Sequence, residues 1–305
     1  MIIWTGLDDL VKTLGLPIED PDEETFLLFA SHALTSDLGF VDRRAQTLEI
    51  SVAGRDLTIA QSPSQLASER KEGTTGAVVW RVTPWFANWI TSSRCPFFDH
   101  GILHDGSTIL ELGCGISGIL PLVLAPRVGR YIVTDQEYVF KSLRRNLETN
   151  KATCSKPRQS KASSKSAITE PRSTIDNVSL LTLDWETSSL ASLSTFLPEG
   201  TDVDLVLACD CIYNEALIAP FVRTCVEICQ LRAATDRPAL CLIVQQLRSD
   251  LVFSAFLAVF MAAFHVWRVP EDRDSRETSS DAGFVMHLGI LRNADGSNVF
   301  KHQGR

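Results

Sequence analysis

The stretch Ile109-Leu-Glu-Leu-Gly-Cys-Gly-Ile-Ser-Gly118 decides the fold of this chain. It predicts a buried strand that ends in a glycine turn and is followed by a helix. The next apolar run, Arg130-Tyr-Ile-Val-Thr-Asp135, predicts a second strand with an acid at its tip. Gly113 and Gly115 can adopt backbone angles that other residues avoid, and they let a ligand approach the backbone. Because the carboxylate of Asp135 can accept hydrogen bonds from two ribose hydroxyls, the two runs predict a ribose site.

Two classes of enzyme use this geometry, and the glycines alone do not choose between them. Dinucleotide-binding enzymes carry G-x-G-x-x-G with an acid about 20 residues further on, and Gly113, Gly115, Gly118 and Asp135 fit that pattern. Methyltransferases that use S-adenosylmethionine carry E-x-G-x-G, which Glu111, Gly113 and Gly115 fit equally well. A glycine turn without a ligand is the third reading.

The composition excludes several classes of protein. The chain has 305 residues and a net charge of −8, so binding of nucleic acid by the whole molecule is not expected. None of its eight cysteines has Cys-x-x-Cys spacing, which favours free thiols in a reducing compartment over a metal site. The amino terminus lacks a charged leader, and the apolar run 251–264 is too short to cross a membrane. We therefore expect a cytoplasmic monomer, with the nucleus as a second location and no membrane partner.

From Thr108 onward, apolar runs alternate with amphipathic segments. This alternation predicts an α/β fold with a doubly wound, mostly parallel sheet of seven strands. The last two strands lack a helix between them and should pair antiparallel, which favours the methyltransferase sheet over the six-stranded dinucleotide sheet. The expected strands are 108–112, 130–134, 179–183, 203–208, 239–246, 263–269 and 284–291. The expected helices are 116–125, 137–149, 215–231 and 249–261.

The expected domain organisation has three parts. Residues 1–75 form an N-terminal extension, in which 47–60 reads as a β-hairpin. Residues 76–295 form the main domain, and 296–305 a C-terminal tail. Within the main domain, 151–178 is rich in Ser and Lys and carries six basic residues against two acidic ones. This segment predicts a disordered, solvated surface insertion. A nucleic-acid or ribosome contact through it is the alternative, and no direct nucleic-acid binding is expected elsewhere.

Polar and aromatic residues follow the third and fourth expected strands, where ligands lie in open parallel sheets. Asp184 could accept a hydrogen bond from an adenine amine, and Trp185 could cover the ring. A turn acid beside a core-edge Trp is the alternative. Asp210 and Tyr213 lie three residues apart after the fourth strand. The structural interpretation of the same segment is that Asn214 caps the next helix. This interpretation and a functional role of Asp210 and Tyr213 can both hold.

One aromatic segment precedes the first core strand. Trp80 lies within Val79-Trp-Arg-Val-Thr-Pro-Trp85, and the segment after Pro84 suits a helix. Such a segment could fold over the sheet edge as a wall for a cofactor. An isolated Trp at such a place is more often part of the core.

These motifs together resemble the family-16 group of S-adenosylmethionine-dependent protein lysine methyltransferases, over about residues 40–295. The resemblance rests on 79–85, 111–118, 133–135, 183–185 and 209–214. It implies cofactor contacts at Trp80, Gly113, Cys114, Gly115, Asp135, Trp185 and Cys209. It places Asp210 and Tyr213 at the methyl-transfer site, and it implies a lysine of a large-subunit ribosomal protein as acceptor.

The expected chemistry needs no metal, because the methyl donor is already activated. The acceptor lysine must lose its proton first, and an anion such as Asp210 opposes this loss. We therefore expect Asp210 to capture and orient the substrate, and Tyr213 to pack on the lysine stem. A nicotinamide-dependent oxidoreductase and a non-catalytic binding protein on the same scaffold stay open as alternatives.

Overall fold

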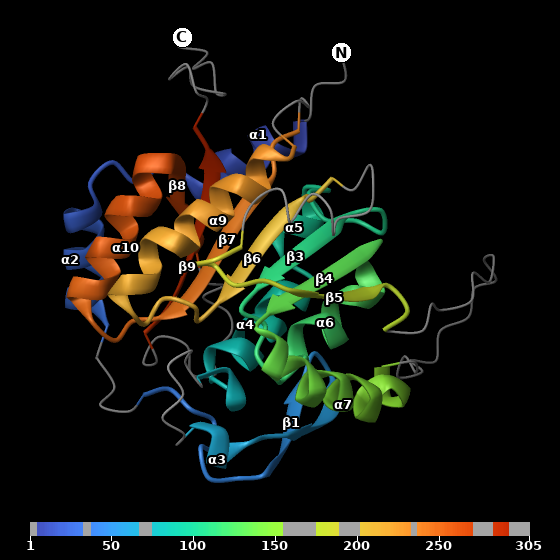
Figure 1. The fold of residues 1–305 in the computed structure, drawn as a ribbon. Helices are drawn as coiled ribbons and strands as arrows, with labels where there is room; N and C mark the ends of the chain where they lie inside the picture. Colours follow the sequence, from blue (N-terminus) through green and yellow to red (C-terminus); the bar gives the residue numbers. More distant parts are fainter. Residues whose placement is uncertain are drawn as a thin grey trace, which may run out of the picture. The chain divides into compact units, whose positions relative to one another are not determined.

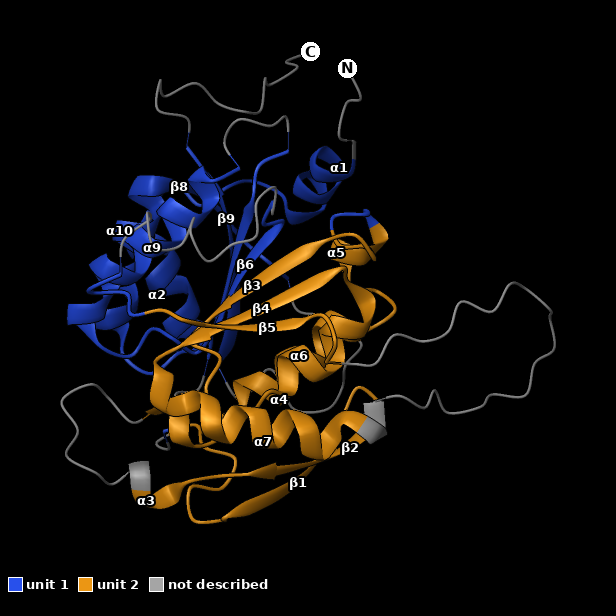
Figure 2. Cartoon of the chain, turned by 45° about the vertical axis from the view of Figure 1, so that its right-hand side comes forward, with its two compact units in different colours: residues 1–38, 100–102, 184–305 blue, residues 39–99, 103–183 orange. Residues whose placement is uncertain are grey.

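The computed structural model describes residues 5–32, 38–66, 75–154, 175–188, 202–232, 237–270 and 283–292. The chain divides into two compact units (Figure 2). Unit 1 comprises Met1–Leu38, His100–Ile102 and Asp184–Arg305, and unit 2 comprises Gly39–Asp99 and Leu103–Leu183. Among the described residues, no helix combines the length and the apolar character that a membrane crossing needs.

Seven strands occur in the order β5-β4-β3-β6-β7-β9-β8 (Figure 1). They are β3 (Thr108–Leu112), β4 (Arg130–Asp135), β5 (Val178–Thr182), β6 (Leu205–Cys209), β7 (Leu240–Gln246), β8 (Phe264–Arg268) and β9 (Phe284–Leu291). Strand β4 pairs parallel with β3 and β5, and β6 pairs parallel with β7. Strand β9 runs antiparallel to β7 and β8. The predicted mostly parallel sheet with an antiparallel terminal pair is confirmed.

In unit 2, β4 is buried except at its two ends, whereas in β5 one residue, Leu181, is buried. Every residue of β3 is buried. The helices of this unit are α3 (Pro63–Leu66), α4 (Val82–Thr91), α5 (Pro96–Asp99), α6 (Ile119–Leu124) and α7 (Glu137–Cys154), with 3-10 turns η1 (Thr75–Ala77) and η2 (Ala125–Arg127). Helix α6 begins three residues later than expected, because Gly118 has the left-handed φ of +66° directly before it.

The hairpin of unit 2 is formed by β1 (Thr47–Val52) and β2 (Arg55–Ala60), as expected. Ala53 and Gly54 both have positive φ, +53° and +70°, which is the geometry of the two-residue turns that match strand twist. Helix α7 continues to Cys154, past its expected end at Thr149 and into the predicted insertion. Residues 155–174 of that insertion, and the predicted tail 296–305, lie outside the described residues.

In unit 1, the helices are α1 (Thr5–Leu14), α2 (Pro21–Ser31), α9 (Ile218–Gln230) and α10 (Asp250–Ala263), with the 3-10 turn η3 (Glu215–Leu217). The expected helix 215–231 therefore begins as a 3-10 turn. Asn214 caps it through its side-chain oxygen, which accepts from Ala216 N at 3.1 Å, so the predicted cap is confirmed. Helix α2 is tied to the strands by its buried Glu24, which binds Arg268 on β8 and His287 on β9.

Candidate functional site

The glycine turn of unit 2 is held by the acid at the tip of the next strand. Asp135 Oδ2 accepts a hydrogen bond from Gly115 N at 2.8 Å, and its Oδ1 accepts from Gln136 N at 2.7 Å. Gly113 and Gly115 have φ of +65° and +60°, a region in which a side chain is strained. A Cβ on Gly115 would also lie 3.3 Å from Gly76 O. The structure thus brings Asp135 and the two glycines together, as the sequence spacing predicts.

Burial raises the pKa of both carboxyl groups at this corner. The pKa of Asp135 rises to about 6 because burial disfavours its charge, and the two backbone N–H donors reduce that rise. On the neighbouring strand β3, burial raises the pKa of Glu111 to about 8, although the Tyr131 hydroxyl donates to its Oε2 at 2.8 Å. Glu111 is therefore mostly protonated at neutral pH, whereas Asp135 is mostly charged.

The aromatic segment reaches the glycine turn through its backbone. Gly76 O accepts from Ile116 N at 3.0 Å, directly after Gly115. Four residues further on, the Trp80 indole N–H donates to Thr75 O at 3.0 Å, and its ring centroid lies 4.3 Å from that of Phe40. Trp80 is only partly buried. Gly76, four residues before Trp80, therefore contacts the turn, and the role of Trp80 as a cofactor wall stays a prediction.

Helix α7 supports the same turn from behind, through a residue that the sequence analysis did not single out. Asn146 is fully buried. Its amide donates to Ile116 O at 2.7 Å and exchanges two hydrogen bonds with the backbone of Ala60 on β2. One turn later, Asn150 makes the matching pair of bonds with Thr58. The sequence signal for this support was the pair of asparagines four residues apart, which places them on the same face of the expected helix.

In unit 1, Asp184 and Trp185 are both half-buried. Asp184 Oδ1 accepts from Glu186 N at 2.8 Å, which is the role of a turn acid. The Trp185 ring meets Phe221 edge-on at 5.0 Å, and its carbonyl accepts from Arg223 at 2.8 Å. The alternative structural role predicted for this pair is thus present, and a role in binding adenine stays a prediction.

Asp210 follows β6 in an unusual conformation, with a φ of +61°. Its side chain is 2% exposed. Arg248 holds both carboxylate oxygens, at 2.7 Å from Nη1 to Oδ1 and 2.5 Å from Nη2 to Oδ2. Cys209 ends β6 just before it and is half-buried, and Tyr213 is 42% exposed. The sequence analysis missed Arg248, although its place just after the carboxyl end of β7 was a usable signal.

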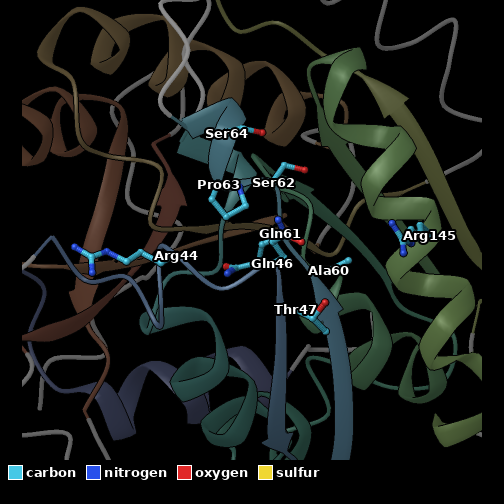
Figure 3. Close-up of a pocket in the computed structure, with 9 residues that line it drawn as sticks. All are labelled: Arg44, Gln46, Thr47, Ala60, Gln61, Ser62, Pro63, Ser64 and Arg145. Carbon is cyan, nitrogen blue, oxygen red and sulfur yellow. The ribbon is translucent and has the colours of Figure 1, made fainter.

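A separate polar pocket of about 310 Å³ lies in unit 2, beside the hairpin and α7 (Figure 3). Its two cationic side chains, Arg44 and Arg145, lie on opposite sides. The lining consists of Arg44, Gln46, Thr47, Ala60, Gln61, Ser62, Pro63, Ser64 and Arg145. Cofactor sites are mostly apolar with few polar groups, and this lining shares no residue with the predicted cofactor contacts. In the part of the chain that the structure describes, no cluster of His, Cys, Asp or Glu could hold a metal ion.

Comparison with known proteins identifies the family. A family model described as lysine methyltransferase matches residues 60–253. Ribosomal lysine N-methyltransferase 5 from Lachancea thermotolerans is 29% identical over 293 residues, which cover 80% of this chain and 88% of that protein. The protein of the same name from Vanderwaltozyma polyspora is 30% identical over 275 residues, covering 76% and 85%.

A longer relative matches over a similar region. A protein of Schizosaccharomyces pombe named diaminohydroxyphosphoribosylamino-pyrimidine deaminase is 30% identical over 257 residues, and the chain spans about half (53%) of its length. The match covers 82% of this chain. The predicted resemblance is confirmed by the family model, which spans the glycine turn, Asp135 and the Asp210 segment: this chain belongs to the lysine methyltransferase family.

Proposed function

We propose that this chain transfers a methyl group from S-adenosylmethionine to a lysine side chain of a protein. The observation that carries the proposal is the hydrogen bond between Asp135 and Gly115 N. This bond holds the glycine turn against Asp135, the acid proposed to bind the ribose, in a chain of the lysine methyltransferase family. S-adenosylmethionine supplies an activated methyl group when it is bound.

The residues of the turn fit this cofactor. Each carboxylate oxygen of Asp135 accepts one backbone N–H bond and retains a lone pair for a ribose hydroxyl. The missing Cβ of Gly115 lets the Gly76 backbone pack against the turn, because a Cβ there would lie 3.3 Å from Gly76 O. Cys114, between the two glycines, is proposed to contact the cofactor, while its N–H donates to Thr134 O at 3.1 Å. Glu111 is buried against Tyr131, and we assign it to support of the turn rather than to direct contact.

The remaining predicted contacts rest on the sequence motifs. Trp80 is proposed as the wall beside the turn, a role that its partial burial supports. Asp184 and Trp185 are proposed to bind the adenine, and Cys209 to contact the cofactor through its backbone. Asp184 can do this while it caps its turn, because the bond from Glu186 N engages its Oδ1 and leaves Oδ2 for the amine.

The acceptor is proposed to meet Tyr213 and Asp210. Tyr213 is exposed enough for its ring to pack on the aliphatic stem of a lysine, or for its hydroxyl to accept from the amine. Asp210 orients the acceptor within the same turn. Most of the rate enhancement would come from positioning.

A ribosomal protein is the proposed substrate, as the names of two relatives suggest, and the family resemblance implies one of the large subunit. Charge supports a basic partner. Unit 1, which contains Asp210 and Tyr213, has 24 acidic against 11 basic residues in the sequence, whereas unit 2 has 13 against 18. An acidic surface favours basic segments. The proposed location is therefore the cytoplasm, where ribosomes work, with the nucleus as the second.

Two other activities have less support. A nicotinamide-dependent oxidoreductase would share the glycine spacing, but the family is that of lysine methyltransferases. A deaminase is suggested only by the name of the S. pombe protein. Zinc-dependent nucleobase deaminases carry H-x-E and Cys-x-x-Cys, and the sequence contains neither pattern.

Isothermal titration with S-adenosylhomocysteine tests the cofactor. We expect heat from the intact chain, and no fluorescence change when reduced nicotinamide nucleotide is added. The opposite pair of results would favour the oxidoreductase. Binding without any transfer of tritium from labelled S-adenosylmethionine to a cell extract would favour a non-catalytic scaffold.

Mass spectrometry of ribosomal proteins tests the substrate. Proteins from cells that lack this chain should have lost one lysine methyl mark, and adding the purified chain with S-adenosylmethionine should restore it. An unchanged methylation pattern across the large subunit would rule out the ribosomal target while leaving the enzyme class intact.

A further inference from the structure

Arg248 forms a close and fully directed ion pair with the acid of the proposed transfer site. Its two terminal nitrogens bind the two oxygens of Asp210, one each, at 2.7 and 2.5 Å. A third donor, Gln246 N, lies 3.3 Å from Oδ1. With its side chain 2% exposed, Asp210 has little carboxylate surface left for any other cation.

The guanidinium itself is fixed from several sides. Arg248 Nε donates to Leu38 O at 3.0 Å, Nη1 donates to Gln246 O at 3.4 Å, and Nη2 donates to Gln246 Oε1 at 3.3 Å. The planar fork of Arg matches a carboxylate in a way that the Lys ammonium cannot. The pair is therefore a built feature of unit 1 rather than a passing surface contact, and its arginine side chain is only 20% exposed.

This pairing bears on a conflict within the proposed chemistry. A lysine with its reference pKa of about 10.4 is almost entirely protonated at pH 7, and only the neutral amine can attack. A buried carboxylate without a counter-charge would favour the ammonium further. An arginine that cancels this charge removes the obstacle while the carboxylate keeps its place and shape.

We propose that Arg248 is a positioning residue for methyl transfer, which neutralises Asp210 so that the acceptor lysine beside Tyr213 can lose its proton. The inference rests on the proposed function. Other titratable side chains on the neighbouring described segments are the thiols of Cys209 and Cys211, the phenol of Tyr213 and the carboxylates of Glu215 and Asp250. Glu215 and Asp250 are exposed to solvent, where water screens their charge.

The pH dependence of kcat gives the direct test, because it reports ionisation in the enzyme–substrate complex. The assay uses tritiated S-adenosylmethionine and large ribosomal subunits from cells that lack the chain. Arg248→Met leaves the Asp210 charge uncompensated, so the rising limb of kcat should move about one unit to higher pH. At pH 7.5 this is about a tenfold loss, recovered near pH 9, with no rise in KM for the subunits.

Removing the carboxylate charge sharpens the test. Asp210→Asn leaves the Arg248 charge uncompensated, so the limb should move to lower pH even though the overall rate falls. The double variant Asp210→Asn/Arg248→Met should lie between the two single variants. It also replaces Arg248→Met if that variant does not fold. Arg248→Lys should keep the parental limb, because the charge remains.

A matched control exists within unit 1. Arg268 makes the same kind of two-pronged pair with the buried Glu24, and Arg268→Met should lower the melting temperature without moving the limb. Equal losses at every pH for Arg248→Met, or limbs that coincide in all variants, would overturn the inference. A parent chain that transfers no methyl group to any subunit would instead overturn the proposed function.

Discussion

Two aspartates occupy comparable places in the two units and are partnered in opposite ways. Asp135 ends β4 in unit 2 and Asp210 follows β6 in unit 1. Asp135 is held by two backbone N–H groups, whereas Asp210 is held by the guanidinium of Arg248. Backbone amides carry no net charge, so Asp135 remains an anion that can accept further hydrogen bonds. Asp210 already has a full counter-charge.

The difference teaches that the place of an aspartate after a parallel strand does not determine its role. The role depends on whether neutral backbone N–H groups or a cationic side chain bind its carboxylate. Asp135 is suited to hold neutral hydroxyl donors, because burial raises the pKa of its carboxyl and neutral backbone amides hold its two oxygens. Asp210, paired with Arg248, presents no uncompensated charge that would keep an acceptor amine as a cation.

Removing each carboxylate in turn should produce the largest difference between Asp135 and Asp210 in cofactor affinity. Asp135→Ala should weaken S-adenosylhomocysteine binding more than a hundredfold, because two hydrogen bonds to a charged acceptor contribute about 1.5–3 kcal/mol each. Asp210→Ala should change this affinity by less than about twofold while methyl transfer is lost. Calorimetric titration of both variants measures the contrast. If both variants bind equally poorly, the assignment of separate roles is wrong.

The second prediction concerns how the affinity for S-adenosylhomocysteine depends on pH. Because the pKa of Asp135 is about 6, the carboxylate gains a proton as the pH falls below that value and loses its capacity to accept from both ribose hydroxyls. The affinity for S-adenosylhomocysteine should be level above about pH 7 and then fall about tenfold per pH unit below pH 6. Asp135→Asn serves as the control, with a weak affinity that does not depend on pH. A parental affinity that stays level down to about pH 4.5 would contradict the ribose assignment.

The third prediction tests how the glycine turn is supported. Asn146→Leu and Asn150→Leu each leave one backbone N–H and one carbonyl of β2 without their partner, and each should cost about 2–4 kcal/mol in the free energy of unfolding. Of the two asparagines, Asn146 is the one that also binds Ile116 O beside Gly115. Only Asn146→Leu should therefore weaken S-adenosylhomocysteine binding, by about tenfold, while Asn150→Leu binds normally in its folded fraction.

Chemical denaturation and calorimetry together measure both quantities for the two asparagine variants. Equal affinities would show that the turn keeps its shape without Asn146. A large loss of affinity in Asn150→Leu would mean that the hairpin as a whole, rather than the single bond to Ile116 O, supports the turn.

The sequence predicted the parts of this molecule that depend on local pattern. The strands, the hairpin turn at Ala53 and Gly54, the Asn214 cap and the contact between Asp135 and the glycine turn all follow from spacing along the chain. The apolar runs 108–112 and 205–209 are buried throughout or nearly so, as a parallel sheet requires.

The features it did not predict depend on contacts between distant residues. Arg248 and Asp210 are 38 residues apart, and Asn146 and Ala60 are 86 apart. No periodicity encodes such a pair, and a buried polar side chain can be assigned a partner only when the fold is known. The late start of α6 has a different cause, because the left-handed Gly118 looks like any other glycine in a helical pattern.

The smallest expected effect on cofactor affinity concerns Glu111, which borders the Asp135 corner but is mostly neutral at pH 7. Its pKa in the folded chain is about 8, above the ordinary value of 4.5. Between these values the folded state keeps a proton that the unfolded state releases, so the free energy of unfolding falls as the pH rises from 4.5 to 8. Glu111→Gln removes this loss. It should melt close to the parent at about pH 5 and roughly 10 °C higher at about pH 9, since a pKa raised from 4.5 to about 8 corresponds to about 5 kcal/mol and about 1 kcal/mol moves Tm by at least about 2 °C.

The hydroxyl of Tyr131 gives the matched control for Glu111. Tyr131→Phe removes the hydrogen bond that this hydroxyl donates to Glu111 Oε2 without removing the carboxyl itself. Because that bond stabilises the charged form, the variant should melt lower than the parent at about pH 9, where the parental carboxyl is ionised. Identical Tm profiles of Glu111→Gln and the parent would place the Glu111 carboxyl in contact with water. Asp135 would then be the one acid of this corner whose pKa burial perturbs.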